Sequence, residues 1–446
     1  MLGMQMTEFV GRKAELNYLQ HRFDTGKPSV CAICGEANIG KTALVHKFCE
    51  DKRHLYISGA PVLPKDNLDM ISRTMSDFSG TFIHLEDLED MFDRIILMCS
   101  MEHVVVVFDH LEALMDNFPE FMQFFHTFRT RRIENTRMMV IICDRTEVHI
   151  GRVFNKLTLK PLKFRDCLDF HPGYTPEQHV LSYFVAGGCP AYHSFMGDCP
   201  EESVFDQFFT GPSAMRSEMD RVLVPGSYPK GHYHKVLSIM ASGMVIPHAM
   251  QQYVRQEGIG VNVSRVMVEL EDRGIVKKVP SRDSKREMYI FNNSLFRFYY
   301  GVVTPVMADA GMMLDRVDRA DYRKRLDDYM EVVFKEVCEE YTSATYSCEF
   351  IGKVRKDGDS ADPDMDFVAS VKENSISRMV VALCRLKGSP MGVQDLDKLV
   401  RRSKAVQGTG KLYCLFSGSG FTDELRNRVK GDSNVRLTTL DDVCRK

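Results

Sequence analysis

The sequence has no tryptophan, no long hydrophobic run and no strong excess of one charge. Its most prominent apolar runs, residues 104–108 and 138–143, each end at an aspartate. They are far shorter than the ~20 residues that a membrane-spanning helix needs, so we expect no transmembrane segment. The formal net charge of −3 gives no global attraction to nucleic acid, and any basic surface must be local. A hydrophobic content of 44% and a charged content of 27% argue against intrinsic disorder.

The chain also lacks the marks of a secreted protein. Its first residues contain no basic segment followed by an apolar core, so no signal peptide is evident and we expect a cytoplasmic location. The 13 cysteines are scattered and mostly single, which in a reducing cytosol favours small core residues over disulfides. Cys31 and Cys34 have the C-x-x-C spacing of redox and zinc motifs, but no second pair lies nearby. We favour core packing for this pair, with metal or redox chemistry as the alternative.

One octapeptide carries a specific chemical signal. It has the spacing G-x-x-x-x-G-K-[ST] and consists of Gly35, Glu36, Ala37, Asn38, Ile39, Gly40, Lys41 and Thr42, followed by Ala43. In such a loop the backbone N–H groups point at phosphate oxygens, the lysine reaches the β- and γ-phosphates, and the threonine hydroxyl ligates Mg²⁺. Residues 29–34 before it read as a strand, and residues 43–48 after it have helical spacing. The sequence therefore predicts a nucleotide-binding P-loop with ATP and Mg²⁺ as its ligands.

A second acidic element is expected in a P-loop ATPase, at the carboxyl end of a buried strand. Residues 104–109 supply it, because four valines and a phenylalanine read as a strand buried on both faces and Asp109 follows them. Many ATPases place a glutamate directly after this aspartate to orient the attacking water, whereas this chain has His110. A neutral imidazole can accept a proton near pH 7, or the protein can be a slow ATPase that works as a nucleotide switch. We favour weak hydrolysis.

The next predicted strand, residues 138–144, also ends in a polar residue. Asp144, or Arg145 beside it, falls where sensor groups contact the γ-phosphate. The alternation of strands and helices between residues 29 and 160 predicts an α/β fold with a doubly wound parallel sheet. Nucleotide is expected at the carboxyl edge of that sheet.

Several segments together resemble the archaeal ATPase family of the STAND/AAA-like P-loop proteins. They are the P-loop, residues 9–16 (FVGRKAEL), the strand 104–109, residues 159–162 (LKPL) and the turn 187–192 (GGCPAY). The resemblance implies an ATPase core over residues 1–165 and a helical lid over 166–228. It also implies that Gly188 and Pro190 lie near the nucleotide and that Arg12 approaches it. As an alternative, the Gly-Gly-Cys-Pro turn simply ends a helix.

Residues 229–305 have the order of a winged helix. Three amphipathic helices are expected at 233–241, 249–255 and 261–273, followed by a hairpin of 275–280 and 287–291 with a basic loop, 281–286. Between residues 229 and 300 there are eleven Lys or Arg against six Asp or Glu, which suits phosphate contacts. However, the presumptive recognition helix carries Glu269, Glu271 and Asp272, which would repel a DNA backbone if they faced it. DNA contact and protein contact both stay open.

Residues 310–446 are expected to form a further α/β domain, with a charged helix at 322–341 followed by strands and helices. The family resemblance implies a restriction-endonuclease-like domain, in which two carboxylates hold a metal and a lysine positions the attacking water. Asp366 matches the first carboxylate, but Leu383 stands at the glutamate position and Arg385 at the lysine position. An expected first-helix glutamate lines up with Lys335. Because leucine cannot ligate Mg²⁺ and arginine stays protonated near pH 7, we predict a degenerate, inactive nuclease domain.

The length of 446 residues fits this organisation of several domains. The favoured hypothesis is an ATP-binding protein with slow Mg²⁺-dependent hydrolysis, in which nucleotide changes how the lid and the winged helix pack. The second hypothesis is a DNA-binding regulatory module with a structural nucleotide, and the third is an ATP-dependent nuclease. The expected partners are ATP or ADP, DNA through the winged helix, and an unidentified protein.

Overall fold

The computed structural model describes residues 9–99, 101–145, 155–224, 226–280, 287–353, 365–373, 376–406, 408 and 410–445. The expected basic loop at 281–286 lies outside these residues. The chain divides into two compact units. The P-loop unit runs to Leu162 and includes Cys189–Ala191, and the carboxy-terminal unit comprises Lys163–Gly188 and the chain from Tyr192 onward.

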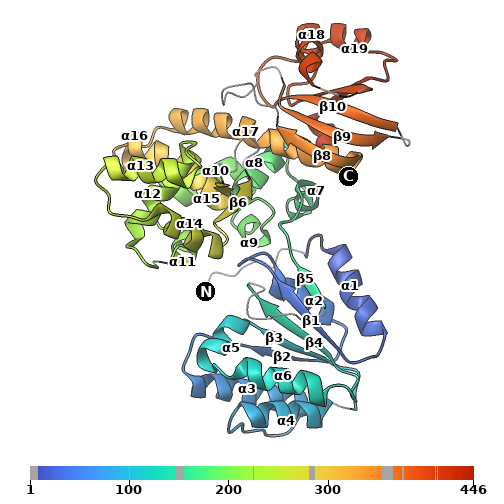
Figure 1. The fold of residues 1–446 in the computed structure, drawn as a ribbon, viewed down its shortest axis with the longest axis vertical. Helices are drawn as coiled ribbons and strands as arrows, with labels where there is room; N and C mark the ends of the chain where they lie inside the picture. Colours follow the sequence, from blue (N-terminus) through green and yellow to red (C-terminus); the bar gives the residue numbers. More distant parts are fainter. Residues whose placement is uncertain are drawn as a thin grey trace. The chain divides into compact units, whose positions relative to one another are not determined.

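The P-loop unit is a five-stranded parallel sheet covered by helices on both faces (Figure 1). Its helices are α1 (Lys13–Asp24), α2 (Lys41–Cys49), α3 (Pro64–Ser79), α4 (Leu88–Cys99), α5 (Leu111–Asn117) and α6 (Phe121–Thr127), with a π-helical turn at Phe128–Arg132. Its strands are β1 (Ser29–Cys34), β2 (His54–Ser58), β3 (Val105–Asp109), β4 (Met139–Asp144) and β5 (Lys156–Thr158). The strand order is β2-β3-β4-β1-β5, and every pair is parallel. The predicted parallel sheet is confirmed.

The central strands are buried on both faces, as their continuous apolar runs predict. Every residue of β3 and β4 is buried. Side chains alternate between the faces, so Val106 and Phe108 join one hydrophobic cluster while Val105 and Val107 join the cluster on the opposite face. Polar side chains are consequently confined to the strand ends.

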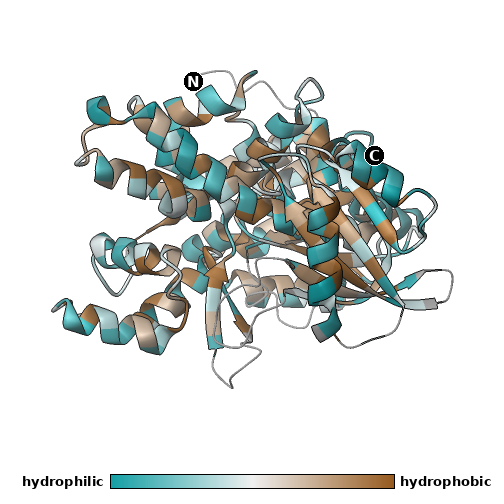
Figure 2. Cartoon of the chain, turned by 90° about the horizontal axis from the view of Figure 1, so that it is seen from above, coloured by the Kyte–Doolittle hydropathy of each residue, from teal (hydrophilic) through white to brown (hydrophobic). Residues whose placement is uncertain are grey.

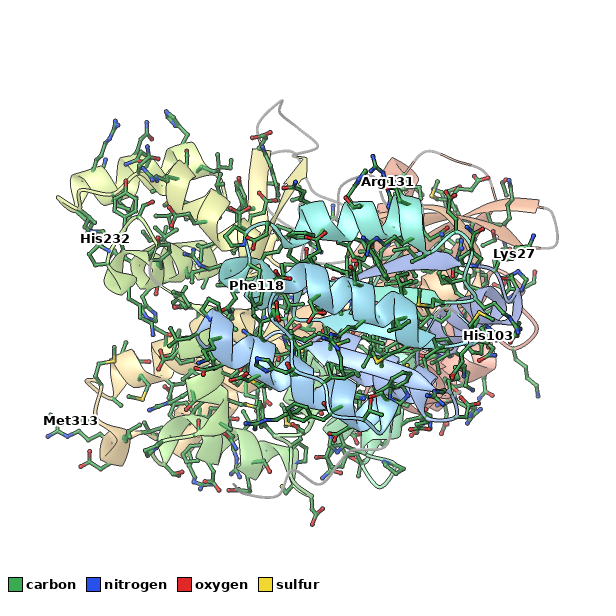
Figure 3. The ribbon with its side chains drawn as sticks, turned by 90° about the horizontal axis from the view of Figure 1, so that it is seen from below. Lys27, His103, Phe118, Arg131, His232 and Met313 are labelled. Carbon is green, nitrogen blue, oxygen red and sulfur yellow. The ribbon has the colours of Figure 1, made fainter. Side chains whose placement is uncertain are left out.

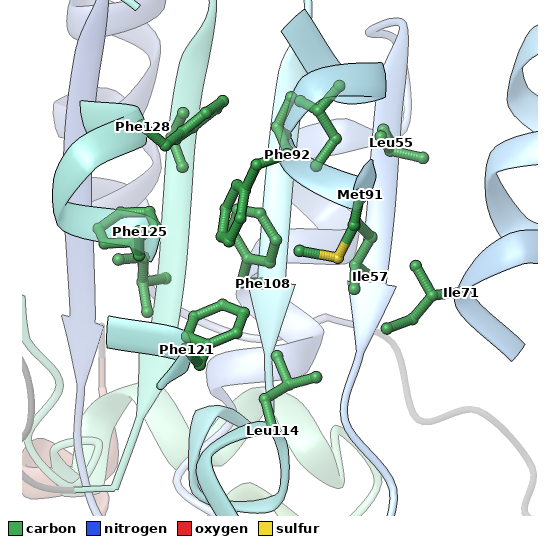
Figure 4. Close-up of a cluster of buried hydrophobic side chains, with 14 of the residues drawn as sticks. Leu55, Ile57, Ile71, Met91, Phe92, Phe108, Leu114, Phe121, Phe125 and Phe128 are labelled. Atoms are coloured by element: carbon green, nitrogen blue, oxygen red, sulfur yellow. The ribbon is translucent and has the colours of Figure 1, made fainter. Parts of the chain in front are cut away.

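Phenylalanines dominate the cluster under α4 and α6 (Figure 4). The ring of Phe92 lies 5.8 Å from that of Phe108 and 5.6 Å from that of Phe121, measured between centroids. Phe125 and Phe128 complete the group, and Phe108 meets Phe121 edge to face. Burial of each such ring contributes roughly 1.5–3 kcal/mol, and a favourable ring pair adds about 0.5–1.5 kcal/mol. This packing fixes β3 and therefore Asp109 at its end.

The two cysteines of the C-x-x-C motif lie on opposite faces of the sheet. Cys31 belongs to the cluster under α1 and α2, whereas Cys34 belongs to the phenylalanine cluster. Burial raises the pKa of Cys31 to about 12, so its thiol stays protonated. Two side chains on opposite faces cannot ligate one ion, and the packing interpretation of this pair is confirmed.

The amino ends of the strands lie opposite the expected nucleotide edge. Figure 3 shows Lys27 and His103, which precede β1 and β3, at one end of the P-loop unit, and Phe118, which follows α5, toward the other. The His103 ring stacks on Phe23 with centroids 3.8 Å apart. This end of the unit is thus closed by packing.

The carboxy-terminal unit begins with helices and one hairpin. The first group of helices contains α7 (Phe164–Cys167), α8 (Pro176–Ala186), α9 (Pro190–His193), α10 (Pro200–Phe209) and α11 (Ala214–Val222). The second group contains the helices α12 (Lys230–Ala241), α13 (Pro247–Gln256) and α14 (Val263–Asp272), the strands β6 (Val276–Pro280) and β7 (Glu287–Phe291), and the helices α15 (Ser294–Phe298) and α16 (Thr304–Asp309). Strands β6 and β7 pair antiparallel directly after α14. Helices in Figure 2 carry both hydrophilic and hydrophobic residues, and an amphipathic helix has an apolar side to bury.

A second five-stranded sheet ends the chain. The 27-residue helix α17 (Arg319–Thr345) leads into β8 (Ser347–Lys353), β9 (Phe367–Glu373), β10 (Ile376–Arg385), α18 (Val393–Arg402), β11 (Lys411–Ser417), α19 (Asp423–Arg428), β12 (Val435–Thr439) and α20 (Leu440–Cys444). The strand order is β12-β11-β10-β9-β8, in which the β8–β9 and β9–β10 pairs are antiparallel and the β10–β11 and β11–β12 pairs are parallel. No helix among the described residues is long and apolar enough to cross a membrane.

A buried histidine holds the turn that follows α8. The ring of His193 is 1% exposed, its Nε2 lies 2.8 Å from the Gly187 carbonyl oxygen, and its Nδ1 lies 3.2 Å from Ser182 Oγ. Burial lowers the pKa of His193 to about 3, because the charged ring would lose its hydration. The folded protein therefore needs the neutral imidazole. His171 nearby also has its pKa lowered by burial.

We predict that the carboxy-terminal unit loses stability as pH falls from about 6.5 toward 3. The unfolded chain protonates His193 near its ordinary pKa of about 6.5, so below that pH the unfolded state binds more protons. The slope for this one group is at most about 1.4 kcal/mol per pH unit. His193→Gln should flatten the dependence of the urea midpoint on pH between about 3.5 and 6.5, whereas His248→Gln, at an exposed position, should not. Equal slopes in all three proteins would contradict the assignment.

Candidate functional site

The P-loop joins the end of β1 to the start of α2, as the motif requires. Gly40 adopts a left-handed backbone with φ of 95°, which a side chain would strain. Its carbonyl accepts the first hydrogen bond of α2, from Leu44 N at 2.9 Å. The backbone N–H groups at this helix start have no partner within the helix, so the loop presents donors to an anion.

Lys41 folds back over its own loop. Its Nζ donates to the carbonyl oxygens of Gly35 at 2.6 Å and Glu36 at 2.9 Å. Burial lowers the pKa of Lys41, although the nearby carboxylates of Asp109 and Glu112 act in the opposite direction. The ammonium group is thus held at the centre of the loop.

Asp109 lies beside the loop and is enclosed by hydrogen-bond donors. Its side chain is 2% exposed. Thr42 Oγ1 donates to Asp109 Oδ2 at 2.7 Å, and the Tyr56 hydroxyl donates to the same oxygen at 2.6 Å. The backbone N–H of His110 donates to Oδ1 at 2.8 Å. The two residues that the sequence proposed as metal ligands, Thr42 and Asp109, are therefore in direct contact.

Tyr56 is a site residue that sequence reasoning missed. It lies on β2, whose register with β3 places Tyr56 beside Val107, two residues before Asp109. Its ring stacks on His46 of α2 with centroids 4.5 Å apart. The sequence does not indicate a role for this tyrosine, because it does not reveal that β2 pairs with β3 in the sheet.

His110 lies next to this carboxylate but faces outward. Its side chain is 61% exposed, and its Nε2 is 3.8 Å from Asp109 Oδ2. The backbone of His110 is left-handed with φ of 53° and forms the N-cap of α5. Gly59 allows this geometry, because a Cβ at that position would lie 2.7 Å from the His110 carbonyl oxygen. An exposed imidazole at the edge of the sheet is accessible to a ligand.

Asp144 occupies the neighbouring strand end. It pairs in register with Cys34, the last residue before the P-loop, and is 2% exposed. Its Oδ1 accepts a hydrogen bond from Arg145 N at 2.7 Å. The two predicted strand-end aspartates thus come to the same edge of the sheet as the loop.

Arg12 lies outside the P-loop and contacts it through a hydrogen bond to the Ile39 carbonyl. The guanidinium is buried, with Nη2 donating to the Ile39 carbonyl at 3.1 Å and Nη1 to Glu15 at 3.0 Å. These bonds place Arg12 behind the loop backbone, where it positions residues 35–42.

Residues 189–191 belong to the P-loop unit. Cys189 Sγ donates to the Asn38 carbonyl at 3.2 Å, and a Cβ at Gly40 would lie 3.5 Å from Pro190 Cγ. The structure therefore brings Pro190 to the loop, whereas Gly188 belongs to the carboxy-terminal unit. The turn at Cys189, 151 residues from Asn38 in sequence, therefore forms part of the candidate site.

The nuclease-like positions do not form a metal site. Asp366 Oδ1 pairs with Lys335 Nζ at 2.6 Å, and its Oδ2 accepts from Cys384 N at 2.6 Å. Arg385 pairs with Asp395 at 2.8 Å, and Leu383 lies in the hydrophobic core. Among the residues that the structure describes, no group of three or more His, Cys, Asp or Glu could hold a metal ion.

The parallel sheet with the loop at its carboxyl edge has the arrangement of a P-loop NTPase fold. No protein-family model matches the chain. It is 24% identical over 352 residues to an uncharacterized protein of Methanocaldococcus jannaschii, spanning 75% of this chain and 77% of that one. An uncharacterized ATP-binding protein of the same organism is 38% identical over 53 residues, 12% of this chain and 86% of that one. The structure of a Walker-type ATPase of Pyrococcus abyssi covers 67% of this chain and 97% of its own, with a TM-score of 0.51 and 11% identity, a likeness of fold.

We predict that Tyr56→Phe destabilises the P-loop unit by about 1–3 kcal/mol, because it removes one donor from a buried carboxylate while the ring can still stack on His46. Urea unfolding measures the change. Tyr18→Phe, which removes a hydroxyl from helix α1 of the same unit, is the control and should change the free energy of unfolding by less than about 0.5 kcal/mol. Equal effects of the two substitutions would show that the Tyr56–Asp109 bond contributes nothing measurable.

Proposed function

We propose that this protein binds ATP with Mg²⁺, hydrolyses it slowly and works as a nucleotide-controlled switch. The observation that carries the proposal is the contact of Thr42 with Asp109, 2.7 Å apart, beside Lys41. A hydroxyl, a buried carboxylate and an ammonium group at a helix N-terminus are the groups that bind a nucleoside triphosphate and its metal ion in P-loop proteins. The similarity to a protein described as ATP-binding supports the choice of nucleotide.

The residues present fit a magnesium ion. Thr42 Oγ1 and Asp109 Oδ2 are both oxygen donors, the atoms that Mg²⁺ prefers, and Asp109 is shielded from solvent at the loop. A bound ion would neutralise charge on the phosphates. In this proposal Lys41 and the backbone N–H groups of residues 35–43 orient the phosphates, and Arg12 holds the loop in shape.

Slow hydrolysis follows from the residue after Asp109. In many ATPases a glutamate there orients the attacking water and accepts its proton, whereas this chain has the imidazole of His110 at that position. The exposed ring of His110 can accept that proton, and Asp144 at the next strand end can orient the γ-phosphate region through Arg145. Binding would then be efficient and turnover weak, which suits a switch.

We predict that Lys41→Ala weakens ATP binding at least tenfold, which corresponds to about 1.4 kcal/mol, and abolishes turnover. Binding is measured by calorimetry and turnover by phosphate release with and without Mg²⁺. His110→Ala should lower turnover and leave binding unchanged. The matched control is Lys47→Ala on the same helix, an exposed lysine paired with Glu50.

Unchanged binding in Lys41→Ala would contradict a nucleotide site at the P-loop. Tight binding with no turnover in the wild type would contradict hydrolysis and leave a binding switch. The switch itself requires nucleotide-dependent exposure of the β6–β7 hairpin. Identical limited proteolysis without nucleotide, with ADP and with a non-hydrolysable ATP analogue would contradict it.

DNA contact through α12–α14 and the β6–β7 hairpin is a second candidate function, proposed as a winged helix. The order of three helices and an antiparallel hairpin supports it. Two of the three acidic residues of α14, Glu269 and Glu271, are tied to the module by hydrogen bonds. Hydrogen bonds from Ser227 and Tyr233 lower the pKa of Glu269 to about 2 and tie its carboxylate to the module, and Glu271 accepts from Lys278 N at 3.0 Å. Arg265 and Lys277 remain exposed for phosphate contacts.

We predict that the full-length protein binds duplex DNA with an affinity that falls with salt, and that Arg265→Gln and Lys277→Gln each reduce the logarithmic salt slope by about one. Fluorescence anisotropy between 50 and 200 mM salt, roughly the range over which counterion release dominates, measures the slope. Lys372→Gln, on the terminal sheet, is the control. A slope that neither substitution changes would favour protein contact.

We also propose that the terminal sheet domain is a nuclease-like fold without nuclease activity. The pairing of Asp366 with Lys335 places an ammonium group where a catalytic metal would have to bind. Duplex DNA incubated with Mg²⁺ or Mn²⁺ should accordingly stay intact.

A further inference from the structure

The carboxy-terminal unit contains a pocket that neither the P-loop nor the nuclease-like positions explain. Its volume is about 420 Å³, within the range of small-molecule sites. It is formed by α7, the carboxyl end of α17, the strand β11, and β12 with the helix α20 that follows it directly. Its characteristic side chains are Arg165, Tyr341, Tyr346, Phe416, Arg436 and Arg445.

The charge of this pocket favours an anion. Its lining contains three arginines and one acidic residue, Asp442, which pairs with Arg445 at 3.6 Å, so two positive charges remain in excess. The Asp442 carboxylate already accepts hydrogen bonds from Thr439 N at 2.9 Å and Thr439 Oγ1 at 2.7 Å. A smaller adjoining pocket of about 200 Å³ is lined by Lys163, Asp166 and Glu340 as well as Arg165 and has no such excess. The attraction for an anion therefore belongs to the larger pocket.

Two of the three arginines, Arg165 and Arg436, are held by protein contacts that orient them. The Arg165 guanidinium lies over the Tyr341 ring, 4.9 Å from its centroid, and its Nε donates to the Val443 carbonyl at 3.4 Å. Arg436 Nη1 donates to the carbonyls of Ser433 at 3.0 Å and Val435 at 3.1 Å. Arginine side chains fixed in this way lose less entropy on binding and can contact phosphate through two N–H groups at once.

The aromatic residues favour a planar group beside the anion. Phe416 is buried and supports Tyr341 by an edge-to-face contact with centroids 5.8 Å apart, so the rings available to a ligand are those of Tyr341 and Tyr346, both half-buried. Aromatic rings next to arginines bind the ring of a nucleobase by stacking, which tolerates any base. The volume, the arginines and the rings together suit a mononucleotide.

We propose that this pocket binds a small phosphorylated ligand of the mononucleotide class. The site is separate from the P-loop and does not rest on ATP hydrolysis. Arg165 lies on α7, three residues after the last residue of the P-loop unit, Leu162, so an occupant would contact the first helix that follows that unit.

The test uses full-length protein with Lys41→Ala, so that the P-loop is disabled, and AMP as the probe, since AMP lacks the β- and γ-phosphates. Calorimetry should show saturable binding of AMP and weaker binding of inorganic phosphate. Arg165→Gln and Arg445→Gln should each weaken AMP at least tenfold, and Arg428→Gln, an exposed arginine paired with Asp397, should leave it unchanged.

Arg445 is 75% exposed, so its substitution tests the site even where Arg165→Gln alters the fold. Absence of AMP binding, or binding that neither substitution at the pocket changes, would overturn the proposal. Equal affinity for AMP and inorganic phosphate would overturn the assignment of the planar group.

Discussion

The two-sided burial of the central parallel strands is the constraint on which the candidate site depends. Polar side chains cannot lie along β1, β3 or β4, so they occur only where these strands end. All the strands run in one direction, and their carboxyl ends therefore meet at one edge of the sheet. The P-loop, Asp109 and Asp144 come together there for this reason. The phenylalanine cluster on one face and α2 on the other hold that edge in register.

The buried carboxylates of Asp109 and Asp366 differ in the groups that contact them, and these groups determine whether a cation would be attracted. Asp109 accepts hydrogen bonds from two hydroxyls and a backbone N–H, which are neutral donors, and the nearby ammonium group of Lys41 makes its hydrogen bonds to loop carbonyls instead. Asp366 is paired with the ammonium group of Lys335 and has its charge cancelled. A cation would gain from the first site and be repelled from the second. The same residue type therefore has neutral donors around it in one sheet and a direct ion pair in the other.

Helix α17 connects most of the carboxy-terminal unit. Its Glu340 accepts hydrogen bonds from Phe164 N at 2.7 Å and the Tyr183 hydroxyl at 3.3 Å, which ties α7 and α8 to it. Lys335 of the same helix forms an ion pair with Asp366, and Tyr341 lines the pocket that contains Arg165, Arg436 and Arg445. A single rigid element of 27 residues thus sets the geometry of the helical region and the terminal sheet together.

The sequence by itself determined the parts of this protein that local rules control. The P-loop follows from spacing, and the buried strands with their terminal aspartates follow from apolar runs, so Lys41, Thr42, Asp109 and Asp144 could all be named. Tertiary structure alone decided which segments meet. Tyr56 reaches Asp109 because β2 pairs with β3, and the pocket forms because α7 packs beside α17 and α20. These contacts join residues far apart in the chain, and their free energy comes from burial that no local pattern records.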